Sequence, residues 1–395
     1  MKRIVSLVAV MLVITAKAQV KSDRIVHFVE SQTKLMLTEV KSKRSTNIDF
    51  VSPRTIEGNE LKMVATKDWT SGFFPGVLWY LYDLTGRKEW KTDAERFTAL
   101  IEEQKTNGTT HDMGFKIYSS FGNGFKLTHD PHYKEVIIQA AKTLATRYNP
   151  KAGVLRSWDH SKDKWAYPVI IDNMMNLELL FEAAKLSGET SLTRVAVSHA
   201  NATMKNHFRA DYSSYHVVDY DSLTGKIIKK TTHQGYANES AWARGQSWGL
   251  YGFTMCYRET HDEKYLGLAE NIAEFILSHP NLPEDYVPYW DFNAPNIPNE
   301  PRDVSAAAIM ASGLFELSLY SRNGKKYRLA AERMITSLSR SYLSTPGSNH
   351  GFILDHSTGT KPTNSEVDVP LIYADYYFLE ALSREKKIKE GKPIL

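Results

Sequence analysis

The segment Trp242–Ser278 reads WARGQSWGLYGFTMCYRETHDEKYLGLAENIAEFILS and contains two helical patterns separated by a polar turn. Its first part, 242–258, is apolar or aromatic on nearly every side, which predicts a helix that is buried all round. Its second part, 263–278, has apolar residues at helical spacing and charges on the opposite face, which predicts a partly exposed helix. The turn Thr260-His261-Asp262 supplies polar residues that end one helix and begin the next. The segment therefore predicts a helical hairpin.

This hairpin recurs weakly along the chain, with related turns at Thr85-Gly86-Arg87, Thr128-His129-Asp130, Ser187-Gly188-Glu189 and Arg322-Asn323-Gly324. Such a repeat predicts that neighbouring hairpins stack and bury one continuous core. We expect outer helices at 22–43, 88–105, 131–147, 189–206, 263–278 and 325–342, and inner helices at 72–84, 113–127, 173–186, 242–258, 304–320 and 370–384. Six alternations predict an all-α fold, a closed (α/α)6 toroid, in which each inner helix is buried between two others. The one competing strand pattern, 217–230 with its turn Leu223-Thr224-Gly225, predicts a small β-hairpin insertion.

The N-terminus has the pattern of a signal peptide. Lys2 and Arg3 precede an apolar run, 4–14, that is too short to span a bilayer, and Ala16-Lys17-Ala18 resembles a cleavage site. The alternative is an uncleaved N-terminal anchor. We expect a signal peptide at 1–18, a single catalytic domain at 19–395 without a membrane span, and a periplasmic or secreted protein.

Composition narrows the range of partners. The 395 residues include 49 basic and 45 acidic side chains, a net charge of +4, and the two signs are mixed along the chain, so nucleic acid is not an expected partner. A single cysteine, Cys256, lies in an apolar helical stretch, which excludes an internal disulfide and predicts a packing role. The eight Trp and 21 Tyr provide flat rings with polar edges that suit sugar faces as well as a core.

Polar residues collect just before the predicted inner helices. If all inner helices of the ring run in the same direction, these residues meet at one mouth; they are Asp68-Trp69, His111-Asp112, Asp172-Asn173, Trp242-Arg244-Gln246, Asp303-Ser305 and Asp368. Each Asp has the alternative role of a helix N-cap, which we favour for Asp303 and Asp368. For Asp112 and Asp172 we favour a pocket, because the following helices are strongly apolar. Paired carboxyl groups across a pocket suit acid and base catalysis on a sugar.

Other chemistries find little support in the sequence. No nucleophile-elbow pattern places a serine at a strand-to-helix turn, and the histidines lack ligand spacing, so we expect neither a serine hydrolase nor a metal or other cofactor. Glycines at 72, 76, 122 and 124 fall inside helical stretches, where they indicate close helix packing or a break.

Several segments of the chain resemble those of a known family. The segments 68–76 (DWTSGFFPG), 111–115 (HDMGF), 172–177 (DNMMNL) and 242–249 (WARGQSWG) are similar, in order and spacing, to those of the unsaturated glucuronyl hydrolases of glycoside hydrolase family 88. The segments 232–236, 303–308 and 373–382 extend the resemblance over essentially the whole chain after residue 18. It implies the same (α/α)6 fold.

The resemblance also implies a reaction. In this family water is added across the C4–C5 double bond of a terminal unsaturated uronic acid, and the hemiketal that forms opens to release the sugar. The resemblance implies that Asp172 protonates C4 and activates the water, so this carboxyl must be neutral at rest. The neighbouring Asp112 would raise its pKa, whereas the helix dipole would lower it. The expected partner is an unsaturated oligosaccharide cut by a polysaccharide lyase.

Binding roles follow from side-chain chemistry and match the family positions. Arg244 suits the substrate carboxylate, and Trp69 and Trp248 offer flat faces to the sugar ring. His216 and Gln234 are expected to hold ring hydroxyls or developing charge. The alternatives are a core role for Trp248, an ion pair between Arg244 and Asp112, and a satisfied loop role for His216.

One segment departs from the family pattern. Some members carry a serine-rich, lysine-containing stretch before the last inner helix, associated with sulfated products, whereas this chain has Lys361-Pro362-Thr363-Asn364-Ser365-Glu366. We expect Ser365 and its neighbours to contact the second sugar without a defined sulfate preference. Two alternatives to a hydrolase of glycosaminoglycan-type disaccharides are a related hydrolase of unsaturated galacturonyl-rhamnose from pectin and a non-catalytic carbohydrate-binding toroid.

Overall fold

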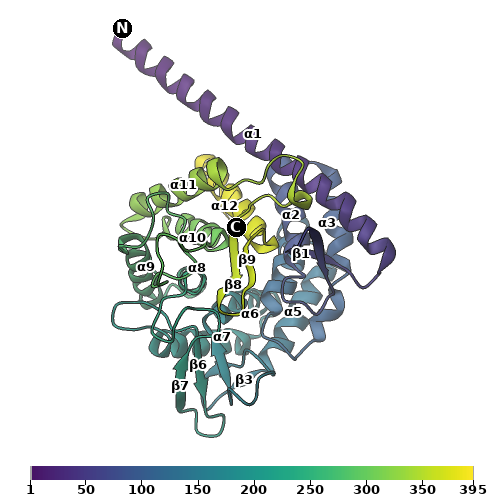
Figure 1. The fold of residues 1–395 in the computed structure, drawn as a ribbon, viewed down its shortest axis with the longest axis vertical. Coiled ribbons are helices and arrows are strands. Elements are labelled where there is room, and N and C mark those ends of the chain that lie inside the picture. Colours follow the sequence, from purple (N-terminus) through teal and green to yellow (C-terminus); the bar gives the residue numbers. More distant parts are fainter. Residues whose placement is uncertain (1, 395) are drawn as a thin grey trace.

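The predicted inner helices form a closed ring in the computed structural model, which describes residues 2–394, with side chains from residue 23 onward (Figure 1). The ring consists of α2 (Phe73–Thr85), η2 (Gly114–Gly122) with α4 (Asn123–Thr128), η3 (Ile171–Asn176) with α6 (Leu177–Ser187), α8 (Ala243–Thr260), α10 (Val304–Leu317) and α12 (Ile372–Lys389). Each packs against the next, and α12 returns to pack against α2. The predicted toroid is confirmed.

The charged, amphipathic segments surround this ring. They are α1 (Lys2–Thr46), α3 (Lys88–Ala99), α5 (Pro131–Ala145), α7 (Thr190–Asn206), α9 (Glu263–Ser278) and α11 (Gly324–Ser341), with a 3-10 helix, η1 (Glu102–Thr106), after α3. α3, α7, α9 and α11 each pack against the inner helix that precedes them, α5 lies between η2 and α6, and α1 contacts α2 and the short helix η4 (Asn349–Gly351). The first part of α1 extends away from the ring in Figure 1.

All inner helices run in the same direction, because their starts contact starts and their ends contact ends. At the starts, Arg244 of α8 pairs with Asp303 before α10, and Trp69 before α2 packs against Tyr373 of α12. At the ends, Tyr80 of α2 donates a hydrogen bond to Glu380 of α12 at 2.7 Å. The residues that precede the inner helices therefore meet at one mouth, as predicted.

The β-hairpin predicted at 217–230 is present as β6 (Val217–Tyr220) and β7 (Ile227–Thr231), and the structure adds short strands that the sequence pattern did not predict. β5 (Pro168–Ile170) joins β6, and three further antiparallel pairs occur: β1 (Ser52–Glu57) with β2 (Glu60–Val64), β3 (Tyr148–Asn149) with β4 (Val154–Leu155), and β8 (Ser357–Thr360) with β9 (Ser365–Val369). A 3-10 turn, η5 (Lys361–Thr363), joins β8 to β9. Of these strands, β3, β4 and β5 have only two or three residues, too few for the alternation that reveals a strand in sequence.

The second inner helix differs from its prediction. Instead of one α-helix over 113–127, the chain forms a π-helix, η2, that continues as α4. A tertiary contact fixes its start: the Asn176 side-chain oxygen accepts the Phe115 N–H at 3.1 Å, and a Cβ on Gly114 would lie 2.7 Å from the Asn176 Cα. π-Helical turns occur frequently at functional sites.

Among the described residues, no helix has the length and apolar character needed to cross a bilayer. The side chains of the predicted signal peptide, 1–18, lie outside the described ones, so the signal peptide stays a prediction.

Close packing of the helix starts predicts a severe effect of Gly72→Ala. A Cβ at Gly72 would lie 2.1 Å from the Lys116 carbonyl oxygen, and backbone cannot yield as a side chain can. We expect a loss of roughly 3 kcal/mol in the free energy of unfolding, measured by urea denaturation. In the control, Gly267→Ala, the new Cβ meets nothing within 4 Å on a helix, so stability should stay unchanged or rise. Equal losses in the two variants would contradict this packing.

Candidate active site

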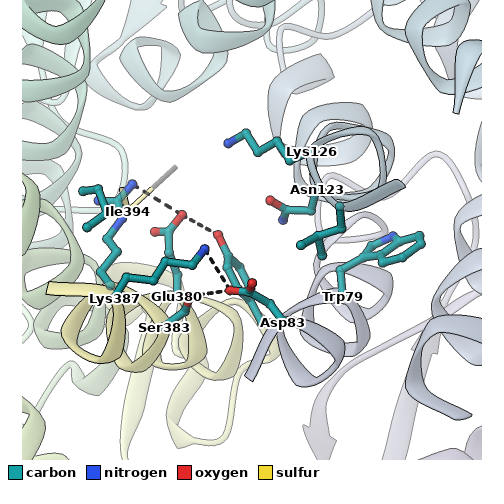
Figure 2. A pocket seen from close by; sticks show the side chains of 11 residues that line it. Trp79, Asp83, Asn123, Lys126, Glu380, Ser383, Lys387 and Ile394 are labelled. Atoms are coloured by element: carbon teal, nitrogen blue, oxygen red, sulfur yellow. Dashed lines mark hydrogen bonds and ion pairs between the residues drawn. The ribbon is translucent and has the colours of Figure 1, made fainter. Parts of the chain in front are cut away.

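The end of the ring opposite the mouth holds charges that satisfy one another. Arg258 pairs with Glu178 at 2.6 Å and with Glu316 at 2.8 Å, and Arg384 pairs with Glu316 at 3.1 Å, all four being almost fully buried on their charged side chains. A cavity of about 100 Å³ opens at this end between α2, α4 and α12 (Figure 2). It is lined by Trp79, Tyr80, Asp83, Asn123, Lys126, Leu127, Glu380, Ser383, Arg384, Lys387 and Ile394. Its carboxylates have partners, as the dashed contacts of Asp83 with Ser383 and Lys387 show.

The mouth differs, because Asp172 is buried there without a complete set of partners. Asp172 lies on η3, and its Oδ2 accepts no hydrogen bond from the described residues. Burial raises the pKa of this carboxyl to about 7; Arg244 opposes the rise, Asp112 adds to it and the Trp248 indole N–H opposes it. A carboxyl with a pKa near neutral pH keeps a substantial protonated fraction there, and this fraction can donate a proton.

Asp112, the second carboxyl group, precedes η2. The Thr110 hydroxyl donates to its Oδ2 at 2.6 Å, and Nε2 of buried His111 lies 3.2 Å from its Oδ1. Neither Asp112 nor Asp172 caps a helix with its side chain. The two groups interact, since Asp112 contributes to the raised pKa of Asp172.

His216 faces Asp172 as a neutral donor. Its Nδ1 accepts the backbone N–H groups of His233 and Gln234, each at 3.1 Å, so the ring proton is on Nε2. Burial lowers the pKa of His216 well below its ordinary value, which keeps the ring neutral. Nε2 lies 3.7 Å from Asp172 Oδ2 and has no hydrogen-bond partner among the described residues. The alternative of a loop histidine whose two ring nitrogens both have partners is therefore wrong, because Nε2 has none among the described residues.

Arg244 is held rigidly beside this pair. Its Nη1 donates to Asp303 at 2.7 Å and to the Thr358 carbonyl, and its Nη2 donates to the Gly359 carbonyl. The ion-pair partner is thus Asp303, and the alternative pairing with Asp112 was wrong. Two of the five guanidinium N–H groups have no partner among the described residues. Contact with a substrate carboxylate stays a prediction.

The two predicted tryptophans lie on either side of Phe115, but they differ in exposure. Trp248 is fully buried, so it contributes to the core; its indole N–H makes no hydrogen bond within the described residues but opposes the rise in the pKa of Asp172. Trp69 is half-buried and packs against Tyr373 with ring centroids 4.9 Å apart. Trp69 is the one with an accessible face for a ligand.

The β8–β9 hairpin lies over the centre of the ring in Figure 1. Of the two remaining predicted residues, Ser365 lies on this hairpin and Gln234 contacts it. Gln234 contacts it, because its Nε2 donates to the Gly359 carbonyl and the Thr360 hydroxyl, each at 3.2 Å. Ser365 is exposed on β9, opposite Thr360.

Asp303 and Asp368 are the two aspartates for which the sequence predicts an N-cap role. Asp303 caps α10 through the Ala306 N–H, which confirms its prediction. For Asp368 the prediction was wrong, since this residue lies in β9 and pairs with His356 at 2.7 Å, four residues before α12 begins. Sequence spacing could not detect that a strand intervenes.

Several neighbours of the site were missed as candidates. Tyr373 packs on Trp69 and lies 5.5 Å from the Arg244 guanidinium, and His111 touches Asp112. Arg54 joins Asp68 to Glu366 of β9, at 2.8 Å and 2.5 Å. His111 had a visible signal, since it directly precedes Asp112, whereas Arg54 lies in a strand that the sequence pattern did not reveal. Among the described residues, no cluster of His, Cys, Asp and Glu has the geometry of a metal site.

Comparison with known proteins identifies the family. The model of Glycosyl Hydrolase Family 88 matches residues 41–380. The chain belongs to this family. It is 54% identical over 326 residues to an unsaturated glucuronyl hydrolase of Formosa agariphila, covering 82% of each chain. It is also 33% identical over 343 residues to an unsaturated chondroitin disaccharide hydrolase of Streptococcus agalactiae, covering 85% of each.

Solved structures of family 88 members agree with the fold. A crystal structure of an unsaturated glucuronyl hydrolase specific for heparin superposes with a TM-score of 0.87 at 46% identity, covering 92% of this chain and 98% of that one. A mutant enzyme from Streptococcus agalactiae, complexed with dGlcA-GalNAc6S, gives a TM-score of 0.78 at 29% identity, covering 93% and 92%. The chain is a glycoside hydrolase, which excludes the non-catalytic binding toroid.

The raised pKa of Asp172 predicts a pH-dependent stability. A buried carboxyl with a pKa of about 7, against about 4 when unfolded, stabilises the fold at low pH, and this contribution is lost as pH rises through 7. The amide of Asp172→Asn cannot ionise, so this variant should not lose stability at this position as pH rises. Between pH 5 and pH 8 the wild type should therefore lose roughly 2 kcal/mol of unfolding free energy relative to the variant, measured by urea denaturation. Parallel curves would show that Asp172 is ionised throughout. Asp375, whose pKa burial raises to about 8, titrates in both proteins and cancels.

Proposed function

We propose that this family 88 enzyme removes a terminal 4,5-unsaturated uronic acid from lyase-generated oligosaccharides of the glycosaminoglycan type. The observation that carries the proposal is the environment of Asp172: a buried carboxyl with a raised pKa, facing a neutral histidine donor and close to an arginine. This combination suits a substrate that carries a negative charge and must receive a proton on carbon.

The proposed reaction is a hydration. Asp172 donates its proton to C4, the C4–C5 π bond breaks, and positive charge develops at C5 and the ring oxygen. The Asp172 carboxylate then takes a proton from water as the hydroxyl bonds to C5, so the carboxyl ends the cycle protonated. The hemiketal opens, and the glycosidic bond between C1 and the next sugar breaks.

The other residues take binding roles in this proposal. The two free N–H groups of Arg244 point to the uronate carboxylate, and the His216 Nε2–H donates to a ring hydroxyl or to the attacking water. Trp69 offers its accessible face to the sugar. Gln234, which contacts the β8–β9 hairpin, and Ser365, which lies on it, are assigned to the second sugar.

A glycosaminoglycan-type substrate is favoured over a pectin fragment by the relatives. Relatives at 54% and 33% identity are named as an unsaturated glucuronyl hydrolase and an unsaturated chondroitin disaccharide hydrolase, and a heparin-specific enzyme is among the similar structures. An unsaturated galacturonyl-rhamnose hydrolase would use the same carboxyl pair, so it is the alternative substrate class for the same site.

We also propose that residues 1–18 are a cleaved signal peptide and that the enzyme is periplasmic or secreted. Lyases that cut extracellular polysaccharide produce the substrate outside the cytoplasm, which agrees with this location. Expression of the full chain in a Gram-negative bacterium should give a product that begins at or near Gln19, determined by N-terminal mass spectrometry of the periplasmic and medium fractions. An intact N-terminus in the cytoplasmic fraction would contradict export.

The substrate proposal is tested with lyase-generated unsaturated disaccharides from chondroitin, heparin and pectin, followed by the loss of absorbance of the conjugated double bond. We expect turnover of at least one glycosaminoglycan disaccharide. Asp172→Asn should reduce kcat at least about a hundredfold, because it removes the proton donor.

A matched control for this loss is Asp163→Asn, which makes the same chemical change at an exposed loop residue and should retain wild-type activity. Turnover of the pectin product alone would contradict the substrate class. Equal activity of the wild type and Asp172→Asn would contradict the role of Asp172.

A further inference from the structure

A single arginine joins the β8–β9 hairpin to the loop that carries Trp69. Arg54 lies in β1, and its Nε and Nη2 donate to Glu366 Oε1 and Oε2 on β9 at 2.5 Å and 3.0 Å. Its Nη1 donates to Asp68 Oδ2 at 2.8 Å. The Arg54 guanidinium therefore uses all three nitrogens on two carboxylates that belong to distant segments of the chain.

This arrangement differs from an ordinary surface ion pair. A guanidinium and a carboxylate that share two hydrogen bonds hold each other in one geometry. The side chains are also shielded from water, since the exposed fraction is 21% for Arg54, 19% for Asp68 and 8% for Glu366. Exposed ion pairs contribute little because water and salt screen them, and these contacts are largely withdrawn from that screening.

The Asp68 end of this contact fixes the turn around Trp69. Oδ1 of Asp68 accepts the Thr70 N–H at 2.9 Å and the Thr70 hydroxyl at 2.6 Å. Trp69 lies between these two residues and packs on Tyr373 with ring centroids 4.9 Å apart. Asp68 thus uses one oxygen for its own turn and the other for Arg54.

The Glu366 end lies against a hairpin residue that the active site already uses. Glu366 is opposite Gly359 in the hairpin, and a Cβ on Gly359 would be 2.7 Å from the Glu366 Cβ. The Gly359 carbonyl accepts N–H groups from Arg244 and Gln234. Glu366 has a φ of 56°, in the left-handed region that non-glycine residues rarely adopt, so its conformation depends on contacts such as that with Arg54.

We propose that Arg54 is a positioning residue for the second sugar of the substrate. It binds β9 to the loop that carries Trp69, so that Ser365 and Gln234 keep fixed positions relative to the uronic acid. A hairpin that is already ordered avoids the entropic cost of being ordered when the substrate binds. The inference rests on the proposed function, in which Ser365 and Gln234 hold the second sugar and Trp69 faces the uronic acid.

The alternative is that these contacts stabilise only the fold. Their loss would then lower the free energy of unfolding without a selective effect on the second sugar. A test must therefore separate the binding of the second sugar from the binding of the uronic acid.

The experiment measures kcat and KM for an accepted unsaturated disaccharide, and the inhibition constant of the methyl glycoside of the same unsaturated uronic acid, which lacks the second sugar. The methyl glycoside competes for the site whether or not it is turned over. The variants are Glu366→Gln, which weakens only the hairpin contact, and Arg54→Met, which removes both contacts. The control is Glu274→Gln, the same chemical change in an ion pair between α9 and α11, with Lys326 at 2.5 Å.

In Glu366→Gln we expect KM to rise roughly fivefold to tenfold, because a charged contact that orders the second-sugar residues is weakened, while kcat and the inhibition constant stay within about twofold. Arg54→Met should raise both KM and the inhibition constant, and KM more, because it also releases Asp68. Glu274→Gln should leave all three values at the wild-type level.

Equal rises of KM and the inhibition constant in Glu366→Gln, or an unchanged KM, would overturn the proposal. If Arg54→Met does not fold, Glu366→Gln alone decides by the same criterion. Failure of both variants to fold would assign Arg54 to the fold and overturn the proposal. A wild type that is inactive on every unsaturated disaccharide would instead refute the proposed function.

Discussion

The common direction of the six inner helices is the constraint on which the rest of the structure depends. Each helix has a partial positive charge at its start and a partial negative charge at its end, and in this ring these charges add instead of cancelling. Anionic groups are favoured at the mouth, and cations are favoured at the opposite end. The buried arginines Arg258 and Arg384 lie near the ends of α8 and α12, where they neutralise both the helix ends and the surrounding glutamates.

The same polarity makes the state of Asp172 informative. A carboxylate at a helix start normally accepts backbone N–H groups, which lowers its pKa. Asp172 lies on the 3-10 helix η3, and desolvation of its carboxyl outweighs Arg244 and the backbone N–H of Asp172, both of which lower its pKa. The sequence could not decide between these opposing effects. The outcome depends on one turn of backbone geometry, and it leaves the mouth attractive to an anionic substrate while keeping one acid neutral.

The sequence was sufficient to predict the ring and insufficient to predict its details. Helical periodicity is a local property, so most inner and outer helices could be placed within a few residues, although α1 begins at Lys2 and not at residue 22. The turn at 223–225 revealed β6 and β7. The π-helix at Gly114–Gly122 depends on Asn176, sixty residues away, and no local pattern records such a contact. Asp303 caps its helix as predicted, whereas Asp368 lies in the strand β9, which the sequence analysis did not predict.

Prediction of the site followed the same division. Residue types near the helix starts identified the members of the mouth, and the family resemblance supplied the reaction. The protonation states of these residues depend on tertiary contacts. The backbone N–H groups of His233 and Gln234 donate to Nδ1 of His216, which fixes the ring proton on Nε2, the nitrogen that faces Asp172. Asp112 likewise differs from Asp172 through its neighbours, since its Oδ2 accepts the Thr110 hydroxyl, whereas Asp172 Oδ2 accepts no hydrogen bond from a described residue. Two chemically identical carboxyl groups acquire different environments by folding, and such a difference allows one to hold a proton while the other stays charged.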